Sequence, residues 1–284
     1  MISRREPALP TFFVIGAAKC GTTSLHAYLH RHPEIGMSRV KEPRYFSRAD
    51  LSARDLRTYM ALFDARFRVR GESSVGYSVA PHRDGVPGRI RATVPDARIV
   101  YLVRDPVERF VTDHVHRTAR GRENRSLAKA ARSAAGSWPG DRGRYAFQLA
   151  PYLDRFDRHR VHVIVSERLD KYRRDTLARL FAFLDVDPDV WDPAFEHRHH
   201  ESRHHRRKGA FGLMLQRVGN SGVASLFPAD ARHRVGRVLY GPFSRPIERP
   251  TLDPETRAIL VDFYRDDVAE LRALLDDPLP EWSL

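Results

Sequence analysis

Residues 11–24 read Thr-Phe-Phe-Val-Ile-Gly-Ala-Ala-Lys-Cys-Gly-Thr-Thr-Ser. The apolar run Phe12–Ile15 predicts a short buried strand, and the apolar spacing after the loop predicts a helix from Thr22 to about His32. The loop between them is bounded by Gly16 and Gly21. At such a strand-to-helix loop, backbone N–H groups and the helix dipole together favour an anion. The segment therefore predicts a binding site for an anionic group.

The lysine of this loop stands in an unusual place. Nucleotide triphosphatases follow the pattern G-x-x-x-x-G-K-[ST], in which the lysine after the second glycine reaches the β- and γ-phosphates. Gly16 and Gly21 keep that spacing, but Thr22 occupies the lysine position, and Lys19 stands two residues before Gly21. The cation is therefore aimed differently from that of a kinase loop.

Two further blocks follow in the chain. Lys41–Phe46 reads K-E-P-R-Y-F, and Arg98–Arg109 reads R-I-V-Y-L-V-R-D-P-V-E-R. With Gly16–Thr23, which reads G-A-A-K-C-G-T-T, they resemble the sulfotransferases that use 3′-phosphoadenosine-5′-phosphosulfate (PAPS), in the bacterial and carbohydrate-type branch. Weaker similarity continues at Gly143–Leu149 and Val161–Leu169. The resemblance thus covers roughly residues 11–185.

Strand-like and helix-like segments alternate along this part of the chain. Short apolar runs predict strands at Phe12–Ile15, Arg68–Arg70, Ile99–Val103 and Val161–Val165. Helical patterns lie between or after them, at Thr22–His32, Asp55–Phe63, Val107–Arg120, Tyr145–Phe156 and Arg174–Leu184. This alternation predicts a doubly wound α/β fold with a parallel sheet and a ligand at the carboxyl ends of the strands. The resemblance implies a P-loop-like three-layer sandwich.

We expect one domain over residues 1–284, with the α/β core at 11–185. Residues 186–284 are expected to hold a basic loop, His197–Lys208, and a helical C-terminal appendage with helices at about Ala229–Leu239 and Pro254–Leu275. The histidines of the loop are interleaved with arginines and lack a spaced ligand pattern, so we expect no metal site there.

The resemblance implies roles for the donor-binding residues. Lys19 would stabilise the bridging oxygen of the leaving phosphate, and the loop would hold the 5′-phosphate with Lys19, Cys20, Gly21, Thr22, Thr23 and Ser24. Arg104 would bind the 3′-phosphate together with Thr112, which replaces the family's serine. Taken alone, Arg104 also fits a salt bridge with Asp105 or Glu108. A late loop that covers the nucleotide is matched by Arg207, Lys208 and Gly209.

A general base must take the proton of the acceptor. The resemblance implies Glu42 in this role, although Glu42 also fits an ion pair with Lys41 or Arg44. Glu72 is the alternative base, and the histidines His82 and His114 are further candidates. Ser73 stands where glycosaminoglycan enzymes tend to carry a lysine, which argues against a heparan-like acceptor.

Composition bears on the location of the protein and on the classes of partner it can have. The chain has 284 residues and a net charge of +13, and of its 49 basic residues only five are lysines, so the arginine bias reflects genome composition. Cys20 is the single cysteine, and no signal peptide or apolar run of membrane-spanning length is visible. We expect a cytoplasmic enzyme with a small-molecule or carbohydrate acceptor and no nucleic-acid partner.

The favoured hypothesis is transfer of a sulfuryl group from PAPS to a hydroxyl of a sugar, glycolipid or secondary metabolite, without a metal. A P-loop nucleotide kinase is one alternative, but Arg104 follows the strand at 99–103 where a magnesium-binding acid is expected. A basic nucleic-acid-binding protein is another, but the arginines are dispersed without interleaved aromatic residues. A protein that binds the nucleotide without transferring a group is the third.

Overall fold

A computed structural model describes residues 8–197, 206–208, 244–246 and 249–284. The expected helix at Ala229–Leu239 and the expected site residue Gly209 lie outside the described residues. Most of the basic loop expected at His197–Lys208 also lies outside them.

The core of the fold is a five-stranded sheet in which every pair of neighbouring strands is parallel, in the order β2-β3-β1-β4-β5. The strands are β1 (Phe12–Gly16), β2 (Ile35–Met37), β3 (Val69–Ser73), β4 (Arg98–Val103) and β5 (Val161–Val165). All five residues of β1 are buried. A strand buried on both faces needs helices on both sides, which explains its continuous apolar sequence.

Two features of the sheet differ from the sequence prediction. β2 was not predicted, because three residues reading Ile-Gly-Met are too few to show a periodic pattern. β3 was predicted at Arg68–Arg70 but runs from Val69 to Ser73. Its second half contains a glycine, a glutamate and a serine, which are poor strand formers, and they enter the strand because they pair with β1 in the buried centre of the sheet.

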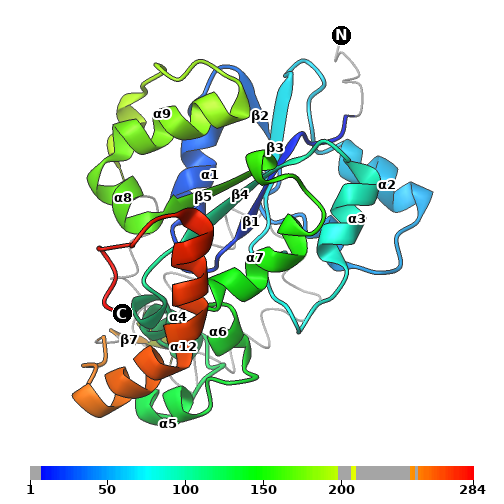
Figure 1. Ribbon diagram of the computed structural model, residues 1–284. Helices are drawn as coiled ribbons and strands as arrows, with labels where there is room; N and C mark the ends of the chain where they lie inside the picture. Colours follow the sequence, from blue (N-terminus) through cyan, green and yellow to red (C-terminus); the bar gives the residue numbers. More distant parts are fainter. Residues whose placement is uncertain (1–7, 198–205, 209–243, 247–248) are drawn as a thin grey trace.

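Helices cover both faces of the sheet, which confirms the expected three-layer α/β fold. Figure 1 shows one layer on one side, made of α1 (Thr22–Arg31), α8 (Ser166–Lys171) and α9 (Arg173–Leu184). The other layer contains α2 (Ala53–Met60), α3 (Val86–Thr93) and α7 (Tyr145–Leu153). The long insertion between β4 and α7 adds α4 (Pro106–Ala119), α5 (Leu127–Arg132) and α6 (Trp138–Asp141). Short 3₁₀ turns lie at Tyr45–Ser47, Arg158–Arg160 and Pro193–Glu196.

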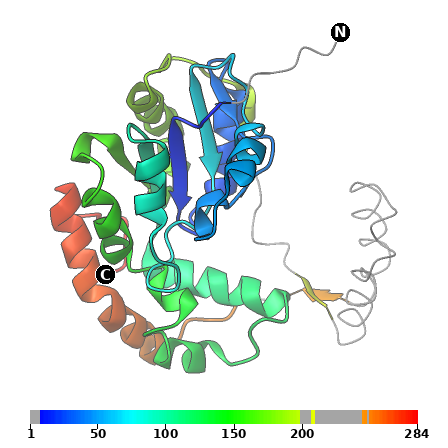
Figure 2. The same ribbon diagram turned by 90° about the vertical axis from the view of Figure 1, so that its right-hand side faces the viewer.

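The C-terminal helix α12 (Pro254–Leu275) has the predicted bounds and packs against α4, α5 and α7 (Figure 2). Asp267 on α12 accepts hydrogen bonds from the backbone N–H groups of Ala146, at 3.1 Å, and Phe147, at 3.0 Å. These groups belong to the first turn of α7, which has no side-chain cap of its own. The appendage therefore caps a helix of the main layer. Near α4, β6 (Arg206–Lys208) pairs with β7 (Ser244–Pro246) in antiparallel fashion.

A substitution at Gly71 in β3 would test how tightly the sheet is packed. A Cβ atom at Gly71 would collide with the buried ring of Phe12 on β1. Because overpacking forces strain into a close-packed core, we expect Gly71→Ala to lower the free energy of unfolding by about 1–3 kcal/mol. Thermal or denaturant unfolding measures this effect.

The matched control is Gly88→Ala in α3, where the new Cβ would meet its nearest atom, Arg155 Nε, at 3.6 Å. Alanine is the better helix former, so this variant should raise the free energy of unfolding by about 0.5–1 kcal/mol. Equal effects of the two substitutions would contradict the packing described for β3.

Candidate active site

A cleft of about 1110 Å³ opens at the carboxyl ends of the strands. Its lining takes residues from the segment after every strand: Ala18 after β1, Lys41 after β2, Val75 after β3, Arg104 after β4 and Ser166 after β5. Parallel strands place their carboxyl ends at one edge, so residues far apart in sequence meet there. The predicted location of the ligand site therefore coincides with this cleft.

The loop after β1 delivers an anion-binding helix end to this cleft. Gly21 is the N-cap of α1 with φ 93°, a left-handed conformation that favours glycine, and it provides no side-chain cap hydrogen bond. Thr22, Thr23 and Ser24 form the first helical residues and line the cleft. The first N–H groups of a helix lack partners within the helix itself, so the first turn of α1 can receive an anionic oxygen.

Cys20 is the one predicted loop residue that does not line the cleft. Its side chain is fully buried, its Sγ lies 3.5 Å from Tyr145 Oη, and its N–H donates to the carbonyl of Ala17 at 3.2 Å. Burial raises the pKa of its thiol to about 11. Cys20 thus packs beneath the loop, and neither its thiol nor its N–H is available to a ligand in the cleft.

Lys19 lines the cleft with a positive backbone φ of 74°. Burial lowers the pKa of its ammonium group to about 8, Asp113 opposes this shift, and Arg120 and Arg142 add to it. Removing a lysine from water disfavours its charged form, whereas a nearby carboxylate favours it. Lys19 is therefore a poorly hydrated cation that loses its proton more easily than an ordinary lysine does. An incoming anion would stabilise its charged form.

Arg104 and Thr112, which the family resemblance assigns to the same site, are hydrogen-bonded to each other in the cleft. Arg104 lies just after β4, and its Nη1 donates to Thr112 Oγ1 at 3.3 Å. Its Nη2 also lies 3.8 Å from Glu108 Oε2, so the alternative ion pair is present too. Glu108 is shared with Arg249, another residue of the cleft lining. The guanidinium of Arg104 is therefore only weakly paired with the carboxylate of Glu108.

The C-terminal tail braces the turn that carries Arg104. The backbone N–H of Asp105 donates to Glu167 at 3.0 Å, and Trp282 Nε1 donates to the other oxygen of Glu167 at 3.3 Å. The N–H of Ser283 donates to Asp105 at 2.8 Å. The ends of β4 and β5 and the tail thus form one hydrogen-bonded unit. Sequence analysis missed it, because no spacing pattern connects residues so far apart.

The two candidate bases lie in different environments. Glu42 lines the cleft with a φ of 60°, and its carboxylate pairs with Lys41, at 3.3 Å, and with Arg44. Burial raises the pKa of Glu42, but the bonds to Arg44 and Lys41 outweigh it and hold the pKa below its usual value. The expected ion pairs are therefore present, and Glu42 also lines the cleft, while its role as general base stays a prediction.

Glu72 is fully buried in β3 and does not line the cleft. Neither of its carboxyl oxygens has a hydrogen-bond partner of good geometry among the described residues. Burial raises the pKa of Glu72 to about 8, and the phenol groups of Tyr77 and Tyr59 oppose this shift without offsetting it. Glu72 is therefore neutral at pH 7 and lies beneath the cleft.

The histidine candidates are also separated from the cleft. His82 Nε2 lies 2.9 Å from the buried carboxylate of Asp141, and neither His82 nor His114 belongs to the lining. Burial lowers the pKa of His114. Of the predicted late loop, Arg207 and Lys208 are described only as backbone, in β6. Within the described residues, no group of three metal-ligating side chains is present, and no helix is both long and apolar enough to cross a bilayer.

Sequence analysis did not single out the basic residues that form much of the cleft wall. They are Arg83, Arg117, Arg120, Arg122, Arg142 and Arg249. Their signal was hidden, because the chain holds 49 lysine and arginine residues spread over its whole length.

Comparison with known proteins identifies the family. Residues 9–211 match the family model described as the sulfotransferase domain, so the chain belongs to the sulfotransferase domain family. Human carbohydrate sulfotransferase 15 is 25% identical over 252 residues, which cover 65% of this chain and 45% of that protein. Mouse bifunctional heparan sulfate N-deacetylase/N-sulfotransferase 4 is 25% identical over 300 residues, covering 96% of this chain and 31% of that protein. This chain thus spans less than half the length of these two curated relatives.

Solved structures agree with the family assignment. A sulfotransferase from Alicyclobacillus acidocaldarius superimposes with a TM-score of 0.68 and 27% identity, covering 98% of this chain and all of that chain. Mouse sulfotransferase SULT7A1, complexed with PAP, shares the fold with a TM-score of 0.52 and 14% identity over 95% of this chain and 89% of that chain. The chain therefore has the P-loop-like α/β fold of these sulfotransferases.

The pKa of Lys19 makes a prediction about pH. If the ammonium form of Lys19 is the active one, kcat/KM should fall as pH rises through about 8, the pKa of Lys19 in the free enzyme. Asp113→Asn removes a charge that raises this pKa, so the falling limb should move to lower pH. The pH dependence of kcat/KM measures both effects.

Asp266→Asn, on the exposed face of α12, is the control with the same change of charge. It should leave the pH profile in place. A profile that shifts equally in both variants would show that net charge, and not the Asp113 carboxylate, sets the pKa of Lys19.

Proposed function

We propose that this protein, as a single domain, transfers the sulfuryl group of PAPS to a hydroxyl of an acceptor bound in the same cleft. One observation carries the proposal. The cleft brings together an uncapped helix N-terminus with Lys19 and, from a different strand, the hydrogen-bonded pair of Arg104 and Thr112. PAPS carries anionic groups at its 5′ and 3′ positions, and these two cationic sites offer a place for each.

The proposed chemistry is an in-line displacement. The first turn of α1 and Lys19 hold the 5′-phosphate, and Arg104 with Thr112 holds the 3′-phosphate. The bond from sulfur to the bridging phosphate oxygen breaks while the acceptor oxygen bonds to sulfur, and Lys19 stabilises the charge on the leaving phosphate. As in phosphoryl transfer, positioning and electrostatics supply most of the catalysis. The product nucleotide is adenosine 3′,5′-bisphosphate.

Glu42 is the proposed base that accepts the proton of the acceptor hydroxyl. Its carboxylate lies in the cleft lining, and its lowered pKa keeps it ionised at neutral pH. The alternative base, Glu72, is enclosed beneath the cleft and is protonated at neutral pH. A group that is buried and already protonated is poorly suited to take a proton from a substrate in the cleft.

The acceptor is proposed to be a sugar hydroxyl, with glycolipids and secondary metabolites as the alternatives. The names of the similar proteins support a sugar, since human carbohydrate sulfotransferase 15 and mouse heparan sulfate glucosamine 3-O-sulfotransferase 3B1 are among them. A family resemblance carries over the donor more reliably than the acceptor, so the donor is the first point to test.

Calorimetry with adenosine 3′,5′-bisphosphate and with Mg·ATP tests the donor. We expect the bisphosphate to bind without a metal. Arg104→Ala should weaken its binding by roughly 10- to 100-fold, as expected for the loss of hydrogen bonds from a charged group. Arg57→Ala, at an exposed position on α2, is the control and should bind normally. Preference of the wild type for Mg·ATP would exclude the proposed donor and favour a kinase.

A pair of isosteric variants tests the base. Glu42→Gln should reduce kcat by about 10²- to 10⁴-fold, the usual contribution of general base catalysis, and should leave the affinity for adenosine 3′,5′-bisphosphate unchanged. Glu72→Gln resembles the protonated acid that burial already favours, and it should retain activity. A larger loss in Glu72→Gln, with normal thermal stability, would assign the base to Glu72 instead.

A further inference from the structure

Four arginines form a cationic cluster on the wall of the cleft beyond Thr112. Arg117 lies near the C-terminal end of α4, Arg120 and Arg122 lie just after that helix, and Arg142 follows α6. All four line the cleft. We call them the arginine cluster. None of them belongs to the predicted donor site.

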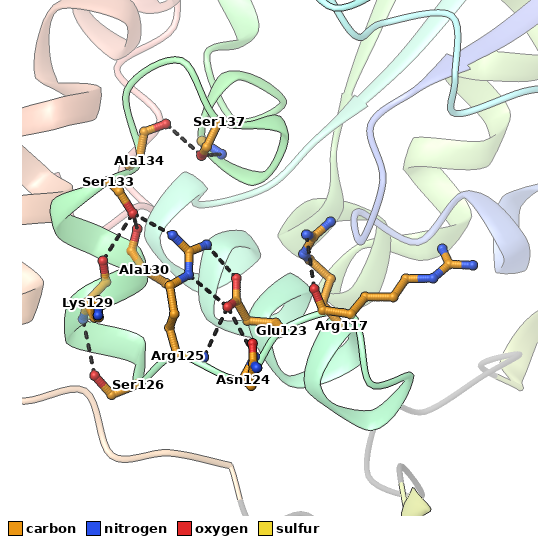
Figure 3. A network of polar contacts seen from close by, with 12 residues as sticks. Arg117, Glu123, Asn124, Arg125, Ser126, Lys129, Ala130, Ser133, Ala134 and Ser137 are labelled. Carbon is orange, nitrogen blue, oxygen red and sulfur yellow. Dashed lines mark hydrogen bonds and ion pairs between the residues drawn. The ribbon is translucent and has the colours of Figure 1, made fainter. Parts of the chain in front are cut away.

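Within the described part of the chain, no carboxylate forms an ion pair with the arginine cluster, although Asp113 in the same lining acts on Arg142 from a longer distance. Among the described residues, no carboxylate lies within 4.0 Å of a guanidinium of the cluster, whereas Arg125 pairs with Glu123 at 2.6 Å. Figure 3 shows the contrast: Arg125 is surrounded by acceptors, and Arg117 reaches only the carbonyl of Arg122, at 3.4 Å. The segment therefore neutralises one arginine and leaves its neighbours unpaired.

Two of these guanidinium groups are also poorly hydrated. The Nε atoms of Arg117 and Arg142 are buried and have no hydrogen-bond partner. Burial lowers the pKa of Arg142, the nearby Asp113 carboxylate opposes this shift, and Arg109 and Arg117 add to it. An unpaired buried donor of a charged group is costly, and an oxyanion is the partner that guanidinium binds best. The empty donors thus favour an anionic ligand.

The cluster lies close to the centre where the sulfuryl group is transferred. Arg120 and Arg142 both lower the pKa of Lys19, which shows that their charges act on the proposed leaving-group lysine. The two anionic ends of the donor already have proposed sites, at the start of α1 and at Arg104 with Thr112. A second ligand bound beside Lys19, the acceptor, is therefore the candidate partner for the charge of the cluster.

We propose that the arginine cluster binds an oxyanion carried by the acceptor, so that the enzyme sulfates a substrate that is already anionic. A sulfate, phosphate or carboxylate near the accepting hydroxyl fits this site. The inference rests on the proposed function, because it takes the cleft to hold PAPS and an acceptor together. It adds a specificity site that excludes neutral acceptors, since they would leave the cluster unpaired.

The experiment uses the full chain saturated with adenosine 3′,5′-bisphosphate. Calorimetry then measures the binding of glucose, glucose 6-sulfate and glucuronate as probes, and the last two separate a sulfate from a carboxylate. The variants are Arg142→Gln and Arg120→Gln. Arg120 is exposed, so its substitution tests the site without a risk to folding. Arg57→Gln on α2 is the control with the same change of charge.

We expect at least one charged sugar to bind and glucose to bind more weakly. Each cluster variant should weaken the binding of the charged sugar by roughly 10- to 100-fold, the loss expected when a hydrogen bond to a charged group is removed. Its affinity for adenosine 3′,5′-bisphosphate, measured separately at a pH well below the pKa of Lys19 so that Lys19 is charged in every variant, should equal that of the wild type and of Arg57→Gln.

Three outcomes would overturn the inference: equal binding of glucose and the charged sugars, no binding of either charged sugar, or weaker binding of adenosine 3′,5′-bisphosphate in the cluster variants. The last outcome would assign the cluster to the donor. A wild type that does not bind adenosine 3′,5′-bisphosphate at all would instead exclude the proposed function, so the two failures are distinguishable.

Discussion

The N-terminus of α1 is the constraint on which the rest of the site depends. The helix starts after the short loop that follows β1, at a glycine in the left-handed region that provides no side-chain cap. Such an end is stable only with water or an anion. The cations around it, Lys19 and Arg104 from separate strand ends, follow from that requirement. The fold thus presents the first turn of α1 to the cleft, and we propose that an anion is bound there.

Burial gives these cations their chemical character. Lys19 and Arg142 are both partly removed from water, which lowers the pKa of each, while Asp113 keeps Lys19 from losing its proton altogether. A desolvated cation interacts more strongly with a ligand charge than one in water. The tail, through Trp282 and Glu167, holds the turn of Arg104 in place. Rigid placement of charge is the main requirement for a transfer reaction that depends on electrostatics.

The sequence allowed the fold to be predicted where local pattern and burial agree. β1, β4 and β5 consist mainly of apolar residues, and they were found within a residue or two. α12 was found with its bounds, because Asp253 and Pro254 mark its start. β2 and the second half of β3 were missed, because their residues have weak local preference and are strands only through pairing with neighbours. Gly71–Ser73 are strand residues because they pair with β1, which is a tertiary effect.

The sequence by itself determined the phosphate loop, the place of Lys19 within it and the spacing of Arg104 and Thr112, because each depends on neighbours a few residues away. Only the tertiary structure decided which loop residue turns inward, which glutamate faces the cleft and which arginines gather without acidic partners. Cys20 and Glu72 are buried, and Glu42 and Arg142 line the cleft. Burial and charge pairing depend on segments distant in sequence, which no local pattern encodes.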